Sequence, residues 1–337
     1  MKIRVGILGA TGYTGLELIK LLLRHPQAEV AVVTSRRDDE PPLAETHPEL
    51  TGRLDLPLLN LSPEEVCRRC DCIFACLPHG AAAESVATCL NADRPVIDFS
   101  ADFRLKDAAV YAHWYGLEHA APQHLPGAVY GLCELYKPQL TTARLVANPG
   151  CYPTAAILPL APLLRAELIE RDGIIIDAKS GVSGAGRTPK LVTHFPECNE
   201  SISAYNVGKH RHTPEIEQEL SAAAGEPVRV VFAPHLVPMD RGILATIYAR
   251  PTRPLTKQDV LAAMREGYQG CPFIRVVDHL PATRHVAHTN FCDMTAEVVG
   301  ETLVMFAAID NLIKGASGAA VQNFNIMFGM EETTALL

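Results

Sequence analysis

A glycine-rich segment follows an apolar run at the start of the chain. Residues 3–8 are mostly apolar, and Gly9, Gly12 and Gly15 come directly after them. The run is typical of a buried strand, and a helix-forming stretch begins at Tyr13. Glycines at such a turn leave backbone N–H groups and the positive helix end open to a pyrophosphate. Because the motif opens a strand-turn-helix unit, it predicts nucleotide binding, and a merely tight turn is the alternative.

The first half of the chain alternates between short apolar runs and helix-forming stretches. Such alternation is typical of a Rossmann-type, doubly wound parallel sheet of the α/β class. We assign residues 1–148 to this nucleotide-binding domain. Strands are predicted at 3–8, 30–34, 72–76, 96–99 and 145–147, and helices at 13–24 and 81–90.

Longer apolar runs follow residue 151 and indicate a second domain. A chain of 337 residues is long enough for two cores. The runs at 173–178, 228–232, 242–249, 274–277 and 302–309 predict a mixed α+β domain over residues 149–310. Two helices have recognisable starts, with Thr213 as N-cap before Pro214 and with Thr256 as N-cap three residues before Asp259. We expect a helix over 311–323 and expect residues 311–337 to return to the first domain.

Composition restricts the partners and the compartment. The formal net charge is −8 and the chain has no dense basic run, which argues against a nucleic-acid partner. The ten cysteines do not form the compact framework of a small secreted domain, so a cytoplasmic location is expected. Met1 leads directly into an apolar run, which leaves no room for a secretory signal. The longest apolar stretch, at 155–164, is too short to span a membrane.

The end of the predicted second strand bears on which dinucleotide binds. The strand is followed by Ser35, Arg36 and Arg37, and the first carboxylate is Asp38. A carboxylate at this place accepts the ribose hydroxyls of NAD, whereas cations accept the 2′-phosphate of NADP. NADP is therefore favoured, and a solvated loop is the other interpretation.

Cys151 lies between a predicted strand and a predicted helix, with Pro153 in the first turn of that helix. A helix N-terminus or a nearby cation can lower a thiol pKa from about 8.5 to about 3.5–7.5, which makes an attacking thiolate available. A second group of cysteines, Cys67, Cys70, Cys72 and Cys76, has short spacings but no matching pair downstream. Packing is favoured over metal binding for that group, and we predict no metal site.

Three further segments carry candidate groups. His210 and His212 flank Arg211 on one loop, where an imidazole can serve as acid and base, although a surface or capping role is equally compatible with the sequence. Residues 180–187 are rich in glycine and serine, so their backbone can approach a ligand, or they form a simple turn. Arg104 follows a predicted strand, where it can bind a phosphate or form a surface ion pair.

These blocks, taken in order, resemble the N-acetyl-γ-glutamyl-phosphate reductases of arginine biosynthesis, within the wider fold group of aspartate-semialdehyde and glyceraldehyde-phosphate dehydrogenases. The resemblance covers essentially the whole chain. It is carried by residues 9–15, 77–80, 100–104, 148–154, 180–187, 209–212 and 310–315.

The resemblance implies an NADP-dependent reductase of a small acyl phosphate, active as a homodimer or homotetramer. It implies that Cys151 is the nucleophile and that His210 or His212 is the acid and base, with His210 preferred. The expected cofactor-binding residues are Gly9, Thr11, Gly12, Tyr13, Thr14, Gly15, Ser35, Arg36, Arg37, Leu77, Pro78, His79, Ser183, Gly184 and Asn311. The expected substrate-binding residues are Arg104, Asn148, Ser180, Gly181, Arg187, Tyr205 and Lys209.

Other activities remain open at this point. An aspartate-semialdehyde dehydrogenase, or a reductase of a carrier-linked acyl phosphate, would use the same chemistry with a different side-chain pocket. A regulatory protein that binds the nucleotide without catalysis is a further alternative, although the presence of Cys151 and both histidines speaks against it.

Overall fold

The computed structural model describes residues 2–337, so Met1, on which the predicted absence of a secretory signal partly depends, lies outside the described residues. The described chain divides into two compact units. The first contains residues 2–149 and 316–337, and the second contains residues 150–315. Residues 311–315, which the sequence assigned to the returning segment, therefore belong to the second unit.

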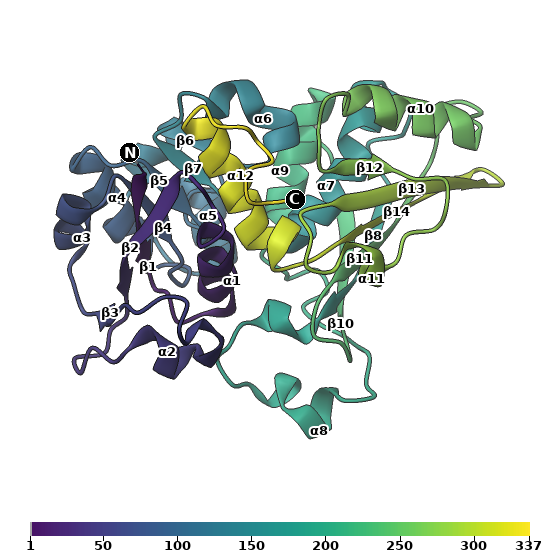
Figure 1. Cartoon of the computed structure of the whole chain (residues 1–337). Helices are drawn as coiled ribbons and strands as arrows, with labels where there is room; N and C mark the ends of the chain where they lie inside the picture. Colours follow the sequence, from purple (N-terminus) through teal and green to yellow (C-terminus); the bar gives the residue numbers. More distant parts are fainter. Residues whose placement is uncertain (1) are drawn as a thin grey trace. The chain divides into compact units, whose positions relative to one another are not determined.

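The first unit is built on a parallel sheet. Within residues 2–337 its strands lie in the order β3-β2-β1-β4-β5-β7-β6 (Figure 1). The strands are β1 (Ile3–Leu8), β2 (Ala28–Thr34), β3 (Leu58–Leu59), β4 (Cys72–Ala75), β5 (Val96–Asp98), β6 (Ala128–Tyr130) and β7 (Leu145–Ala147). The helices are α1 (Tyr13–Leu22), α2 (Leu43–Thr46), α3 (Pro63–Arg69), α4 (Ala83–Asn91), α5 (Ala108–Tyr115), α6 (Cys133–Leu140) and α12 (Gly318–Met327). The predicted Rossmann-type α/β class is confirmed.

Both faces of this sheet are buried, which explains why its strands are apolar without alternation. On β4, Ile73 packs into a cluster with Val66 of α3 and Val86 of α4. Its neighbour Phe74 points to the other face, where its ring lies 5.7 Å from that of Phe324 on α12. The sheet therefore separates two layers of helices.

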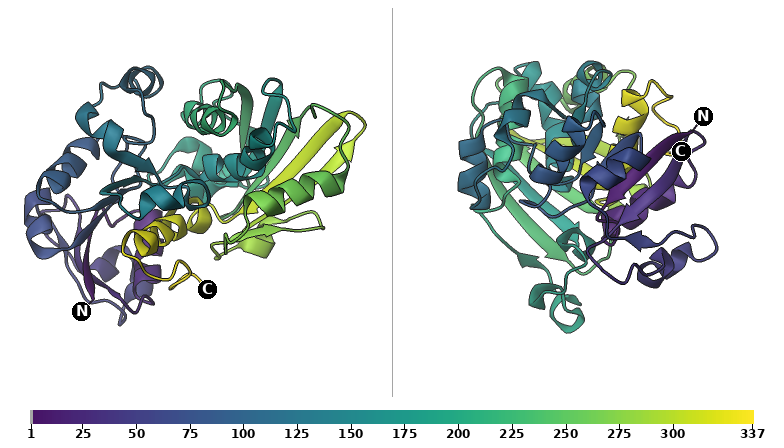
Figure 2. Two further views of the ribbon diagram at one scale, coloured as in Figure 1. Left: turned by 90° about the horizontal axis from the view of Figure 1, so that it is seen from above. Right: turned by 90° about the vertical axis from the view of Figure 1, so that its left-hand side faces the viewer.

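The C-terminal segment completes the first unit. The hydroxyl of Ser317, just before α12, donates to the carbonyl of Thr14 in α1, across 303 residues of sequence. Figure 2 shows the yellow C-terminal helix beside the purple N-terminal elements of the same unit. The helix predicted over 311–323 differs in detail: a π-helical turn at Ile313–Ser317 comes first, and α12 then runs to Met327.

The second unit is built on a mixed sheet. Among the described residues its strands lie in the order β12-β13-β14-β11-β8-β10-β9. The strands are β8 (Ile174–Gly181), β9 (Ser203–Ala204), β10 (Val230–Val237), β11 (Ile243–Ala249), β12 (Ile274–Val276), β13 (Cys292–Val299) and β14 (Thr302–Ile309). The helices are α7 (Cys151–Arg165), α8 (Phe195–Cys198), α9 (Thr213–Ala224), α10 (Lys257–Gly267) and α11 (Thr283–Val286).

The two predicted helix starts in this unit have different outcomes. Thr256 is the N-cap of α10, and it forms a capping box with Asp259, as predicted. The prediction for α9 was wrong by one residue, because Thr213 is its first helical residue and His212 occupies the N-cap position. Strand β13 was missed, because its polar residues Asp293 and Thr295 are buried and obscure the alternation typical of strands.

None of the helices formed by residues 2–337 is long and apolar enough to cross a bilayer.

Candidate active site

The glycine-rich loop of the first unit joins β1 to α1. Gly9 has a φ of +78°, and a Cβ there would lie 2.8 Å from the carbonyl oxygen of Cys76. A Cβ on Gly15 would lie 2.7 Å from the carbonyl oxygen of Ala10. These two glycines are therefore required by the close approach of backbone segments.

Gly12 has a different role in the same loop. It is the N-cap of α1, and around a Cβ built there the described chain places no atom within 4 Å, its own neighbours aside. The segment from Gly12 to Leu16 contains no acidic side chain. The start of α1 is thus open and favourable to an anion, which fits the pyrophosphate of a dinucleotide.

The other predicted cofactor-binding segments lie on neighbouring strands of the same sheet. Residues 35–37 follow β2 and residues 77–79 follow β4, on either side of β1. The N–H of Cys76 donates to the carbonyl of Leu8, which brings the ends of β4 and β1 together. From β1 the chain continues to β2 and β3 on one side and to β4 and β5 on the other, so the direction of strand addition reverses between β1 and β4. In parallel sheets of this kind, ligands bind outside the carboxyl ends of the strands at such a point.

The two arginines after β2 differ in their contacts. Arg36 is exposed. Arg37 forms two contacts with Asp39, from Nε to Oδ1 at 3.0 Å and from Nη2 to Oδ2 at 2.5 Å. Asp38 accepts from the side chain of Asn60 at 2.8 Å. Arg36 is therefore the better placed of the two arginines for a 2′-phosphate.

Arg104 and Asn148 are buried in the first unit. Arg104 donates from Nε to the carbonyl of Asn148 and from Nη2 to the carbonyl of Phe99, each at 2.8 Å. The side chain of Asn148, which is 1% exposed, donates to the carbonyl of Ala316 and accepts from Asn323. These contacts hold the ends of β5, β7 and the returning chain together.

A buried carboxyl lies beside this group. Asp98 is fully buried at the end of β5 and accepts from both the N–H and the hydroxyl of Ser100. Burial raises its pKa to about 7 in spite of these two hydrogen bonds.

Cys151 is the first residue of α7 in the second unit. Gly150 is the N-cap, and it offers no side chain to satisfy the N–H groups of the first turn. The thiol thus lies at the positive end of a 15-residue helix and is partly exposed. This environment favours the thiolate.

Aromatic rings surround His210. Its ring centroid lies 5.5 Å from that of Tyr152, 5.4 Å from that of Tyr205 and 5.2 Å from that of Phe232. The hydroxyl of Tyr205 donates to that of Tyr152 at 3.1 Å. Since Tyr152 follows Cys151 directly, this cluster brings His210 to the start of α7.

His212 belongs to the same cluster. Its ring lies 4.8 Å from that of His210, and its backbone N–H donates to Nδ1 of His210 at 3.1 Å. This hydrogen bond fixes the orientation of the His210 ring and makes Nδ1 an acceptor.

Burial lowers the pKa of His210 to about 4, and the neighbouring charge of Arg211 lowers it further in the same direction. The imidazole is therefore neutral at pH 7, and because Nδ1 is the acceptor, its proton lies on Nε2. Burial, together with the nearby Cys151, raises the pKa of Tyr205, so its hydroxyl keeps its proton.

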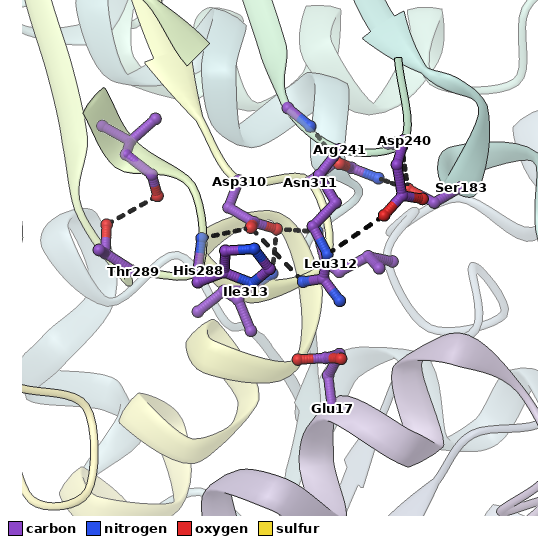
Figure 3. A network of polar contacts seen from close by, with 12 residues as sticks. Glu17, Ser183, Asp240, Arg241, His288, Thr289, Asp310, Asn311, Leu312 and Ile313 are labelled. Carbon is purple, nitrogen blue, oxygen red and sulfur yellow. Dashed lines mark hydrogen bonds and ion pairs between the residues drawn. The ribbon is translucent and has the colours of Figure 1, made fainter. Parts of the chain in front are cut away.

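The glycine-rich segment after β8 is tied to the end of β14. Asn311 accepts from the N–H of Gly242 at 2.7 Å and donates to the hydroxyl of Ser183 at 3.0 Å (Figure 3). Ser183 donates in turn to the carbonyl of Asp240 at 2.6 Å. Asn311 thus holds this loop in place, and both belong to the second unit.

Some of the other predicted binding residues of the second unit are buried and some are exposed. Ser180 and Gly181 are buried, and a Cβ on Gly181 would lie 2.3 Å from the carbonyl oxygen of Asp240. Gly184, Arg187 and Lys209 are exposed.

Three of the four clustered cysteines pack as predicted, whereas Cys76 is partly exposed. Cys67, Cys70 and Cys89 lie in the apolar cluster between α3, α4 and the sheet, and Cys72 is fully buried on β4. Burial raises the pKa of Cys70 to about 12, which keeps it protonated. Cys151 is thus distinguished from these cysteines by its position at a helix N-terminus.

Several residues of the site were not identified from the sequence. Tyr152 and Phe232 carry no motif that marks them, and they become relevant because they contact His210. The sequence predicts no role for Glu215 or Gly315. Their contacts join segments far apart in sequence, so local patterns could not reveal them.

Comparisons with known proteins agree with this architecture. Residues 4–143 match the family model described as semialdehyde dehydrogenase, NAD binding domain, and residues 151–311 match semialdehyde dehydrogenase, dimerisation domain. Aspartate semialdehyde dehydrogenase II of Vibrio cholerae has a similar fold, with a TM-score of 0.74 at 16% identity over 98% of this chain and 99% of that one. The enzyme of Candida albicans, solved with NADP, gives a TM-score of 0.67 at 18% identity over 97% and 99%. Fold and site together define the semialdehyde dehydrogenase class.

Curated relatives narrow this class. N-acetyl-gamma-glutamyl-phosphate reductase of Rhodopirellula baltica is 53% identical over 99% of this chain and 98% of its own length. The enzyme of the same name from Symbiobacterium thermophilum is 51% identical over 100% and 98%. The chain belongs to the N-acetyl-gamma-glutamyl-phosphate reductase family.

Proposed function

We propose that this chain reduces N-acetyl-L-glutamyl 5-phosphate to N-acetyl-L-glutamate 5-semialdehyde, with release of phosphate and with NADPH as the reductant, in arginine biosynthesis. The observation that carries the proposal is a cysteine at a helix N-terminus whose neighbour Tyr152 packs on a partly buried, neutral histidine, in a chain of this family. Beyond the family assignment, we propose roles for Cys151 and His210 and name NADPH as the cofactor.

The chemistry begins with the Cys151 thiolate, which forms at the start of α7 as the thiol loses its proton to water. Neutral His210, with its proton on Nε2, serves as a hydrogen-bond donor to the acyl oxygen. The thiolate attacks the acyl carbonyl carbon, the bond to the phosphate oxygen breaks, and a thioester forms on the sulfur. The backbone N–H of Cys151 stabilises the oxyanion, and loss of one such donor typically costs about 10²–10³ in rate. The chemistry that NADPH supplies when bound is hydride donation to the thioester carbon. The carbon–sulfur bond then breaks, the aldehyde leaves, the thiolate is regenerated, and the released phosphate takes up a proton from water.

The residues present fit such a cofactor. The open start of α1 at Gly12 suits the pyrophosphate, and the exposed guanidinium of Arg36 suits a 2′-phosphate. Arg36 supports NADP over NAD, because no carboxylate occurs between the end of β2 and Asp38.

The substrate-binding candidates fall into two groups. The exposed cations Arg187 and Lys209 suit the phosphate and carboxylate of the substrate, and Tyr205 lies beside Cys151. Arg104 and Asn148 are buried and bound to backbone carbonyls, so we assign them a positioning role.

We further propose that the chain forms homo-oligomers through its second sheet. Helices α7, α9 and α10 pack on one face of this sheet. On the uncovered face Val231, Ile175 and Tyr248 lie side by side in register and are 56%, 43% and 36% exposed. An apolar row of this kind is suited to a second copy of the chain. Ten cysteines held as thiols support a reducing, cytoplasmic setting.

The test is turnover in the reverse direction. The purified enzyme is given N-acetyl-glutamate semialdehyde, phosphate and NADP, with parallel assays that replace NADP by NAD or the substrate by aspartate semialdehyde. We expect the highest kcat/KM with the first combination. A higher kcat/KM with aspartate semialdehyde would overturn the substrate assignment, and a preference for NAD would overturn the role of Arg36.

A further inference from the structure

The backbone that carries the nucleophile is held by contacts from two distant segments of the second unit. Neither of the two residues that make these contacts takes part in the proposed chemistry. One comes from a carboxylate in the first turn of α9, and the other comes from a glycine in the π-helical turn after β14.

The carboxylate is that of Glu215. Its Oε1 accepts a hydrogen bond of 2.8 Å from the backbone N–H of Gly150, the residue before Cys151. Glu215 is 1% exposed, so this hydrogen bond is made without competition from bulk water. The carbonyl of Gly150 accepts from the N–H and the hydroxyl of Thr154, each at 3.0 Å. Both polar groups of the Gly150 backbone are therefore fixed.

A buried carboxylate is costly unless positive groups surround it. Glu215 meets this condition because it lies in the first turn of α9 and accepts from the N-cap residue of α7. The positive ends of both helices therefore face its charge. The same helix begins directly after His212, so α9 connects the histidine loop to the nucleophile loop.

The glycine is Gly315. A Cβ built there would lie 2.8 Å from Cβ and 3.2 Å from Cα of Cys151. Real Cβ atoms do not approach other carbon atoms this closely, so any side chain at this position displaces Cys151. Cys151 thus packs directly against the backbone of Gly315.

The position of Gly315 is itself defined by Asp310. The N–H of Gly315 donates to the Asp310 carbonyl at 2.9 Å, a bond across five residues that makes the turn π-helical. The Asp310 carboxylate accepts from the N–H groups of Leu312 and Ile313 (Figure 3). These bonds hold the turn in the one conformation that brings Gly315 against Cys151.

We propose that Glu215 and Gly315 are positioning residues that clamp residues 150–151 and so set the direction of the Cys151 thiol and N–H. The inference rests on the proposed role of Cys151 as nucleophile. Glu215, on α9, holds the N–H of Gly150 by a hydrogen bond. Gly315, after β14, limits the position of Cys151 by direct contact. A displacement of about 1 Å at a reacting group can cost about 10²-fold in rate, so such a clamp has a direct effect on turnover.

The test uses Glu215→Gln and Gly315→Ala. For Glu215→Gln we expect kcat to fall by about tenfold or more, because a charge-assisted hydrogen bond is replaced by a neutral one. Loss of the nearby negative charge also favours the thiolate, so alkylation of Cys151 by iodoacetamide shifts to lower pH. For Gly315→Ala we expect kcat to fall by about 10²-fold. KM for NADPH stays unchanged in both variants.

Matched controls separate positioning from general damage. Glu217→Gln changes a glutamate on the same helix whose Oε1 accepts from the N–H of Val230 instead. Gly127→Ala adds a methyl group where residues 2–337, apart from the two chain neighbours of Gly127, place no atom within 4 Å of it. Both controls are expected to keep kcat within about twofold, and all variants are assayed well below their melting temperatures.

Two results would overturn the proposal. One is wild-type kcat in Glu215→Gln or Gly315→Ala. The other is an alkylation profile in Glu215→Gln that is unchanged from wild type while kcat falls only as far as in Glu217→Gln. If Gly315→Ala does not fold, kcat and the alkylation profile of Glu215→Gln alone test the proposal. Alkylation requires no substrate, so it tests the clamp even if the assigned substrate is wrong.

Discussion

His210 shows how surroundings decide the chemistry of a residue. The sequence identified a loop with two histidines and preferred His210, but it did not contain the reason. Tyr152, Tyr205 and Phe232 come from three segments, and only the fold brings them around the imidazole. Cys151 could be predicted because its helix start is local, whereas Glu215 and Gly315 could not, since their contacts join residues 65 and 164 positions away from their partners.

A pH dependence of stability follows from the lowered pKa of His210. The unfolded chain binds a proton at this residue below about pH 6.5, and the folded chain does so only below about 4. Between these values the unfolded state binds more protons, so stability falls as the pH falls through this window. His210→Asn is expected to lose less stability than the wild type between pH 7.5 and pH 5.

Urea unfolding at the two pH values measures this difference. His113→Asn serves as the control, because His113 is exposed. An equal loss of stability in His210→Asn and in the wild type would contradict burial as the cause of the lowered pKa.

At the scale of elements, the starts of two helices were predicted from their threonines, and only one of these threonines is an N-cap. Thr256 and Thr213 both precede a helix-forming stretch, and an N-cap role was predicted for each. The Thr256 hydroxyl accepts from the N–H of Asp259, as a cap does. The Thr213 hydroxyl lies inside α9 and finds no hydrogen-bond partner within residues 2–337. Pro214 fits either arrangement, since proline is accepted throughout the first turn.

Substitution of the two threonines is therefore expected to have unequal effects. Thr256→Ala removes a cap and lowers the free energy of unfolding by about 1 kcal/mol. Thr213→Val keeps the shape and removes a hydroxyl that makes no bond, so stability is unchanged or slightly higher. Thermal or urea unfolding compares them, and a larger loss in Thr213→Val than in Thr256→Ala would contradict the assigned helix starts.

At the scale of the whole molecule, the sequence predicted two domains of the correct classes. Among the described residues, periodicity identified five of the seven strands of the parallel sheet, because these are apolar on both faces, and it missed the short strands β3 and β6. It was less informative for the second sheet, where β13 buries Asp293 and Thr295. The return of the chain at residue 316 follows a π-helical turn, and no residue pattern marks such a turn.

Association through the uncovered face of the second sheet can be tested by adding charge to it. Ile175→Glu places a carboxylate in the centre of the apolar row formed with Val231 and Tyr248. Burial of this charge between two copies is costly, so we expect a smaller assembly by light scattering coupled to size exclusion. Val110→Glu, on α5 of the first unit, is the control. An unchanged molar mass for Ile175→Glu would contradict this interface.

The most direct measurement is the mass of the enzyme after it is mixed with N-acetyl-glutamyl phosphate without NADPH. Hydride is then missing, so the acyl group should stay on the sulfur, and intact-protein mass spectrometry should detect one N-acetyl-glutamyl group, located on the peptide with Cys151. Cys151→Ser should show none under the same conditions. Absence of an adduct in an active wild-type enzyme, or an adduct that persists in Cys151→Ser, would contradict covalent catalysis by Cys151.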